Sequence, residues 1–154
     1  MKIRAVLAGL ALALLVTSVA DAGQIGQSRK LKDSKGNLMK ITLVHVKDGV
    51  HLANEFEQPD KGNRFVAVYV RVLNLSGATL NDCGTNDGAL TSKGGAKFAD
   101  AFGTLNPALA CYRVLPHRQA EGWILYQVPL KAKPAYFDYT PDSGFADATA
   151  DFKL

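Results

Sequence analysis

The stretch Arg64-Phe-Val-Ala-Val-Tyr-Val-Arg-Val-Leu-Asn74 has a hydrophobic period of two residues, and this period decides the fold. Alternate side chains of a strand project to opposite faces. One face then carries Val66, Val68, Val70 and Val72, and the other carries Phe65, Ala67, Tyr69, Arg71 and Leu73. Valine is β-branched and favours extended backbone over helix. The stretch therefore predicts a central strand whose valine row faces a core.

A second run of the same kind extends from Glu121 to Val128. Its alternation puts Gly122, Ile124, Tyr126 and Val128 on one face. Pro129 follows, and proline cannot continue a central ladder because it lacks the backbone N–H. The run predicts a second core strand that ends near Pro129.

Shorter alternating runs predict further strands at residues 28–31, 40–46, 90–92, 96–99, 112–115, 135–139 and 149–152. In the run 40–46 the pattern places Ile41, Leu43 and His45 on one face. Residues 33–37, 81–88, 93–95 and 141–144 have the glycine and Asx composition of turns. Only residues 100–110 offer room for a turn or two of helix. Seven to nine short antiparallel strands are typical of a β-sandwich or a barrel, and we predict the all-β sandwich.

The N-terminus has the pattern of an export signal. Lys2 and Arg4 precede an uncharged run from Ala5 to Ala20, and Ala20-Asp21-Ala22 has the small residues of a cleavage site. We predict that residues 1–22 are a cleaved signal peptide and that residues 23–154 are a single domain. A transmembrane anchor is the alternative, but the apolar run is short for a bilayer span. The expected location is the periplasm or the extracellular medium.

The chain contains two cysteines, Cys83 and Cys111, both after the predicted cleavage site. An even pair in an exported protein favours a disulfide over free thiols. The pair has no Cys-x-x-Cys spacing, and two cysteines are too few for a structural zinc site. We therefore predict a structural Cys83–Cys111 disulfide.

Three motifs resemble those of a bacterial exported family of telokin-like, immunoglobulin-type sandwiches, which includes a small secreted immunoprotective antigen of mycobacteria. They are the glycine-led strand from Gly62 to Asn74, the glycine hairpin from Leu90 to Phe98, and Leu115-Pro116 followed by the run from Gly122 to Pro129. The resemblance implies an immunoglobulin-like antiparallel sandwich outside the cytoplasm and carries no catalytic residues. His117 stands where the family has glycine, which leaves the geometry of that turn open.

No combination of residues predicts catalysis or a cofactor. Gly-x-Ser-x-Gly is absent, and His45, His51 and His117 are expected at the surface or in packing positions. The loop from Asn81 to Gly88 has oxygen-bearing side chains, but a calcium-loop count places Lys93 where a glutamate is required. Glu55 and Glu57 are interpreted as solvated loop charges. We predict a chain that is not an enzyme and holds no metal.

Two sets of residues form candidate binding surfaces. The first is a basic strip of Arg29, Lys30, Lys32, Lys35 and Lys40. It suits an anionic polymer, although lysines on an edge strand also protect that strand from unwanted pairing. The second comprises Phe65, Tyr69, Trp123 and Leu125, which point away from the predicted valine face. This set forms a contact surface if exposed and a second packing layer if loops cover it.

We therefore expect an exported, non-catalytic recognition module whose partner is a protein or an anionic envelope polymer. A small secreted enzyme, enzyme accessory or inhibitor with a loop-borne site is the alternative. Nucleic acid is not expected, because the basic strip lacks interleaved aromatic residues and the compartment is wrong. Stable membrane insertion after cleavage is not expected either. The sequence leaves the oligomeric state open.

Overall fold

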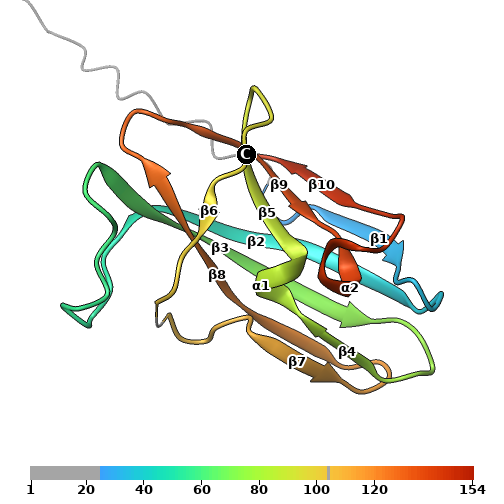
Figure 1. The fold of residues 1–154 in the computed structure, drawn as a ribbon. Helices are drawn as coiled ribbons and strands as arrows, with labels where there is room; N and C mark the ends of the chain where they lie inside the picture. The colour runs from blue at the N-terminus through green and yellow to red at the C-terminus, as the bar shows by residue number, and fades with distance from the viewer. Residues whose placement is uncertain (1–24, 104) are drawn as a thin grey trace, which may run out of the picture.

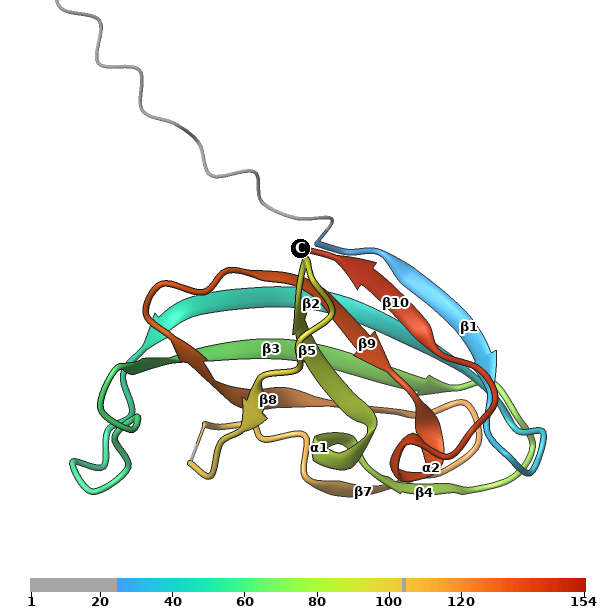
Figure 2. The same ribbon diagram turned by 45° about the horizontal axis from the view of Figure 1, so that its top comes forward.

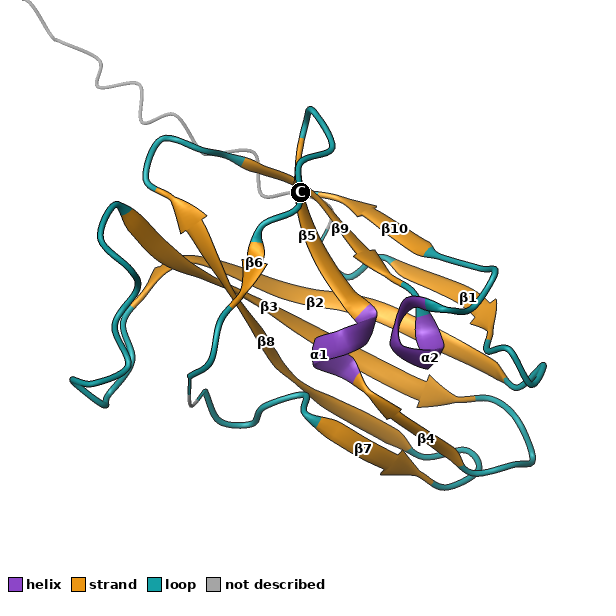
Figure 3. Cartoon of the chain, viewed as in Figure 1, coloured by secondary structure: helices purple, strands orange, loops and turns teal. Residues whose placement is uncertain are grey.

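A computed structural model describes residues 25–103 and 105–154, so the predicted signal peptide lies outside the described residues. The chain folds into antiparallel sheets, and its only helices in the described ranges are two short turns (Figure 3). The larger sheet has five strands in the order β1-β2-β3-β8-β6. Their bounds are β1 Ser28–Lys32, β2 Leu38–Val50, β3 Asn63–Asn74, β8 Gln119–Pro129 and β6 Ala99–Asp100. Strands β2, β3 and β8 run the length of the molecule (Figure 1).

A second layer covers one face of this sheet. It contains a three-stranded sheet in the order β10-β9-β5 and a two-stranded ribbon of β4 and β7. The bounds are β5 Gly88–Ser92, β9 Pro134–Tyr139, β10 Ala150–Lys153, β4 Leu80–Cys83 and β7 Cys111–Val114. Figure 2 shows β5, β9 and β10 lying across the long strands β2 and β3. The short helices α1 (Gly84–Asp87) and α2 (Pro141–Gly144) lie beside the ribbon.

The core between the two layers is the one that the valine pattern predicts. All four valines of β3, from Val66 to Val72, are completely buried, as is Val128 of β8. They pack with Phe137, Phe152 and Tyr139 from the second layer. Full burial of a Val or Leu side chain contributes about 1.5–3 kcal/mol, so each residue of this row stabilises the contact between the layers. The predicted all-β antiparallel sandwich is confirmed.

The hairpin between β1 and β2 forms where the turn composition predicts it. Asp33 accepts hydrogen bonds from the backbone N–H groups of Lys35 and Asn37 at 3.0 and 2.7 Å. Gly36 adopts φ +81°, a conformation that glycine tolerates best. The predicted disulfide is also present: Cys83 and Cys111 are register partners across the β4–β7 ribbon.

The turn predicted at 141–144 is present as the short element α2, in which Asp142 and Ser143 have left-handed φ values of 57° and 56°. Two other expectations about the connections are wrong. Part of the predicted turn at 81–88 is strand β4 and helix α1. The described residues of 100–110 contain no helix. Instead this segment runs along β8, where the Trp123 N–H donates to Pro107 O and the Leu109 N–H donates to Trp123 O. Gly122 permits this approach, because a Cβ there would lie 2.4 Å from backbone atoms of Ala108 and Leu109.

Candidate binding site

The second layer covers one face of the five-stranded sheet, and the opposite face is called the uncovered face. It carries a row of three rings, one from each long strand. Register pairs His45 of β2 with Tyr69 of β3, and Tyr69 with Trp123 of β8. The Tyr69 and Trp123 ring centroids are 4.9 Å apart at an interplanar angle of 75°. Those of His45 and Trp123 are 6.0 Å apart at 65°. Edge-to-face contacts of this kind hold the rings in a fixed arrangement.

A β-bulge brings His45 into this row. The β2–β3 register shifts between Leu43 and His45, leaving Val44 as the extra residue. The sequence pattern predicts His45 on the face of Ile41 and Leu43, and that prediction is wrong. Leu43 is buried in the core, whereas His45 is exposed on the opposite face and Val46 packs against the core. The apolar residues change phase at the bulge, from Ile41 and Leu43 to Val44 and Val46, so the adjacent apolar pair Leu43-Val44 is the sequence signal of the shift.

Lys47 places a positive charge on the ring row. Its ammonium group lies 4.8 Å from the centroid of the Trp123 ring. A cation over an indole face at an exposed site is stabilised by about 0.5–1 kcal/mol. The bulge makes this contact possible, because Lys47 is two residues beyond His45 and shares its face.

A surface pocket of about 410 Å³ opens beside Trp123. One wall is the end of β2 and the residue that follows it, and another is the segment that runs along β8. The lining residues are Lys47, Asp48, Gly49, Val50, His51, Leu105, Asn106 and Trp123. This volume lies in the range of small-molecule sites, which combine apolar or aromatic walls with a few polar groups.

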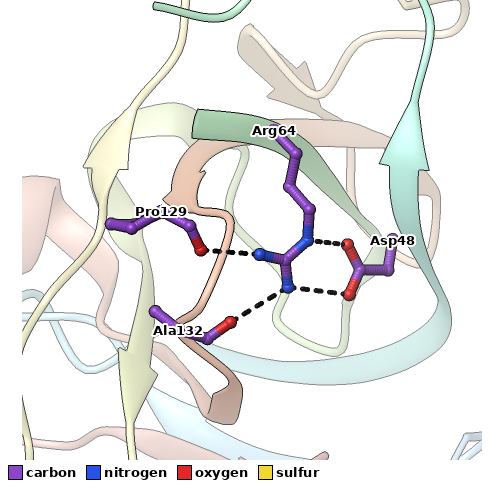
Figure 4. A network of polar contacts seen from close by, with 4 residues as sticks. All are labelled: Asp48, Arg64, Pro129 and Ala132. Atoms are coloured by element: carbon purple, nitrogen blue, oxygen red, sulfur yellow. Dashed lines mark hydrogen bonds and ion pairs between the residues drawn. The ribbon is translucent and has the colours of Figure 1, made fainter. Parts of the chain in front are cut away.

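Two carboxylates beside this site, those of Asp48 and Glu121, are paired with arginines. Arg64 forms a bidentate pair with Asp48 and also donates to Pro129 O at 2.7 Å and Ala132 O at 3.1 Å (Figure 4). This network ties the end of β2, which forms the pocket rim, to the end of β8. The hydrogen bond to the Asp48 carboxylate raises the pKa of Arg64 above its usual value.

The second pair lies next to the ring row. The Arg71 Nε donates to Glu121 Oε2 at 2.6 Å, and both side chains are partly exposed. Burial, with a smaller effect of the Glu121 charge, raises the pKa of the neighbouring Tyr69 phenol.

The five residues of the predicted basic strip do not lie on one surface. Lys30 and Lys40 are register partners that alternate with buried Leu31, Met39 and Ile41, so they point to the same face as the ring row. Lys32 pairs with Leu38 on that face, at the end of β1. Arg29 points to the other side, where its guanidinium lies 5.6 Å from the Phe152 ring centroid. Lys35 lies in the β1–β2 turn.

The predicted aromatic set is only partly available to a partner. Phe65 and Leu125 are 2% and 6% exposed. With Leu52 and Ala67 they form a second small core on this face of the sheet, against which Ala101, Leu105 and Trp123 pack. Of the four predicted residues, the structure leaves Tyr69 and Trp123 partly exposed and buries the other two. The alternative in which loops cover part of the face is the one observed.

Sequence reasoning missed the part that histidines play in this site. His45 belongs to the ring row and His51 lines the pocket, whereas His117 lies in the β7–β8 turn. From the sequence, His45 and His51 are expected at the surface or in packing positions and are not connected with a site. The β2 bulge, which the adjacent apolar pair Leu43-Val44 marks in the sequence, brings His45 into the ring row.

A second group of polar side chains lies under the short helices. Asp87 is 3% exposed and accepts hydrogen bonds from the Tyr139 hydroxyl and the Ser143 N–H, both at 2.8 Å. The Tyr112 hydroxyl lies 2.9 Å from that of Tyr139. Burial, opposed in part by the Tyr139 hydrogen bond, raises the pKa of Asp87 to about 7. Within the described ranges, no three or more His, Cys, Asp or Glu side chains are arranged to hold a metal ion.

Comparisons with solved structures support the fold. The chain superposes on a secreted protein from Mycobacterium tuberculosis, MPT63, with a TM-score of 0.65 and 12% identity over 86% of this chain and 95% of that one. The yjhA protein from Bacillus subtilis matches with a TM-score of 0.60 and 15% identity over 84% of this chain and 97% of that one.

A third structure is longer than this chain. The ycdA protein from Bacillus subtilis, a candidate lipoprotein, matches with a TM-score of 0.63 and 18% identity over 82% of this chain. The chain spans 38% of that protein's length. At these identities the three likenesses establish the fold alone.

Among curated proteins, none is similar enough to this chain to count as a match. The sequence model of one family matches residues 23–150, almost the whole of the predicted mature chain. This match and the MPT63 fold confirm the resemblance that the three sequence motifs indicate. The chain therefore belongs to the family described as a domain of unknown function, DUF4352.

Proposed function

We propose that this protein is an exported, non-catalytic recognition module that binds its partner through the uncovered face of the five-stranded sheet. The observation that carries the proposal is the ring row of His45, Tyr69 and Trp123, with the Lys47 ammonium 4.8 Å from the indole centroid. Aromatic rings that are held rigidly at the surface lose little conformational freedom on binding, so they are effective contact groups.

Charge on this face favours an anionic partner. The ion pairs between described residues are Arg64–Asp48 and Arg71–Glu121, and Lys30, Lys40 and Lys47 belong to neither. Lys30 and Lys47 are exposed, and Lys40 is partly exposed. Cations that lie outside these ion pairs attract anionic molecules and accelerate their association.

Three features support the export part of the proposal. The first is the signal-peptide pattern of residues 1–22. The second is the Cys83–Cys111 disulfide, because such bonds persist mainly in oxidising compartments. The third is the likeness to a protein described as secreted and to a candidate lipoprotein. Periplasm and extracellular medium both agree with these features.

The test is capture of partners from envelope and culture extracts on immobilised residues 23–154. We expect capture at low salt, weaker capture at high salt, and loss of capture by the variants Lys47→Glu and Trp123→Ala. The matched control is Lys153→Glu, since Lys153 is exposed on β10, outside the five-stranded sheet. If the Lys47→Glu and Trp123→Ala variants capture a partner as well as the Lys153→Glu control does, that partner binds elsewhere on the protein.

A further inference from the structure

The pocket beside Trp123 has the chemistry of a sugar site. The Trp123 indole and the side chains of Val50 and Leu105 supply apolar surface for the C–H faces of a ring. The Asn106 amide and the His51 imidazole supply hydrogen-bonding groups that suit hydroxyls. The volume of about 410 Å³ is large enough for one sugar unit.

The only ammonium group in this lining is that of Lys47. It lies at the junction between the pocket and the ring row, 4.8 Å from the indole centroid. Asp48 also lines the pocket, but its carboxylate is bound by Arg64 on both oxygens (Figure 4). The net charge that a ligand meets here is therefore positive, and the complementary group is a carboxylate, sulfate or phosphate.

The cations continue along the sheet away from the pocket. From Lys47 the same face of β2 leads back past His45 and Thr42 to Lys40, which is paired with Lys30 of β1. At about 3.3 Å per residue, the path from Lys47 to Lys40 is roughly 20 Å long. A single small anion cannot span this distance, whereas a polymer with repeated negative charges can contact both ends.

This composition favours a polysaccharide over a protein partner. Lysine is depleted in protein–protein interfaces, whose buried centres are apolar. Here the large apolar side chains of the face, Phe65 and Leu125, are buried under the chain's own loops. On the sheet face and in the pocket, the groups left for a partner are mainly rings, lysines, the Arg71–Glu121 pair, an amide and an imidazole, whereas the fully exposed Phe102 lies on the connecting segment beside them.

We propose that the ligand is an acidic polysaccharide, with one sugar in the pocket beside Trp123, its anionic group on Lys47, and the next units along Lys40 and Lys30. This inference rests on the proposed function and specifies the partner class of the same face. Because the chain contains a single tryptophan, fluorescence reports on the pocket directly.

The experiment is a titration of residues 23–154 with three polymers, followed by calorimetry and by Trp123 fluorescence. The probes are oligogalacturonate, the same chain fully methyl-esterified, and polyglutamate of equal charge. We expect oligogalacturonate to bind and change the fluorescence, and the neutral ester to bind at least tenfold more weakly. Polyglutamate, which lacks sugar rings, is expected to leave the fluorescence unchanged.

Variants then test which side chains contact the ligand. Lys47→Gln and Asn106→Ala are expected to weaken oligogalacturonate binding about tenfold, and Lys153→Gln is the control that leaves binding unchanged. Both altered side chains are exposed, so these variants keep the fold. Equal effects of oligogalacturonate and polyglutamate on affinity and fluorescence would overturn the sugar assignment.

The outcome also separates this inference from the proposed function. If no acidic polysaccharide binds but extract capture still depends on Trp123 and Lys47, the sugar assignment is wrong and the recognition face stands. If neither polysaccharide binding nor the capture of extract partners depends on Trp123 and Lys47, both proposals are wrong.

Discussion

Asp87 is a buried carboxylic acid whose hydrogen bonds come from neutral donors. The groups that face it are Tyr139 of β9, Ser143 of α2 and the carboxylate of Asp82 on β4, with Tyr112 of β7 behind Tyr139. None of these is a cation. Burial therefore raises the pKa of Asp87 to about 7, well above the usual range of an aspartate side chain.

The raised pKa has a consequence for stability. Because the folded-state pKa exceeds the unfolded one, the stabilisation from protonated Asp87 is full below about pH 4 and is lost as pH rises through 7. We expect the stability of the unaltered protein, measured relative to Asp87→Asn, to fall by about 1–2 kcal/mol between pH 4 and pH 8, after allowance for partial hydration. Chemical denaturation at several pH values measures this. If the stability of the unaltered protein and that of the Asp87→Asn variant change with pH in the same way, the prediction is wrong. The control is Asp147→Asn, because Asp147 is exposed.

His117 occupies the position at which the family motif has glycine. Its φ is +59°, in the left-handed region that costs non-glycine residues about 1–2 kcal/mol. His117→Gly is expected to raise the free energy of unfolding by up to about 1 kcal/mol, since the greater freedom of glycine in the unfolded chain offsets part of the gain. His117→Ala keeps the strain and is expected to give no gain. A midpoint of thermal unfolding that is no higher in the glycine variant would refute this explanation.

At the scale of elements, the segment along β8 depends on the absence of a side chain at Gly122. A Cβ there would meet backbone atoms, which cannot move as a flexible side chain can. Gly122→Ala is expected to lower the free energy of unfolding by about 1–3 kcal/mol and to displace Leu105 and Asn106 from the pocket. Gly94→Ala is the control, because a Cβ at Gly94 lies 3.9 Å from its nearest neighbour. Denaturation and ligand titration together test the prediction, and it is wrong if the two variants behave alike.

The disulfide joins the two strands of the β4–β7 ribbon and closes a loop with a sequence separation of 28. In the chain-entropy model, closing a loop of this length stabilises the folded state relative to the unfolded chain by roughly 3.5 kcal/mol. Replacing both Cys83 and Cys111 by Ser is expected to remove about that amount and to leave binding at the Trp123 face intact, since the ribbon belongs to the second layer. If both thiols of the exported protein react with an alkylating reagent before reduction, the disulfide is absent in the cell.

At the scale of the whole molecule, the two candidate surfaces of the sequence converge on one face. Part of the basic strip and part of the aromatic set lie on the side of the five-stranded sheet that the second layer leaves uncovered. Lys30 and Trp123 are more than 90 positions apart in the chain, and the strand order β1-β2-β3-β8 connects them through hydrogen-bonded neighbours. Long-range pairing therefore creates the face.

Export also belongs to this scale. We expect the exported protein to begin at Gly23, because Ala20 and Ala22 provide the small residues that signal peptidase requires. Mass spectrometry of protein recovered from the periplasm and from the medium measures the N-terminus and decides between the two locations. Recovery of the full-length chain in the membrane fraction would instead indicate an uncleaved anchor.

The sequence by itself determined the layers of this protein. The period-two rows of β3 and β8 require a buried face, and the turn composition at 33–37 requires a hairpin, because both depend on local backbone preference and on burial. The tertiary structure alone decided the site. The bulge at Val44 moves His45 to the outer face, and the segment along β8 covers Leu125 and forms the pocket wall. Both result from pairing between separate segments, β2 with β3 and residues 107–109 with β8, and only the bulge leaves a local trace, the change of apolar phase at Leu43-Val44.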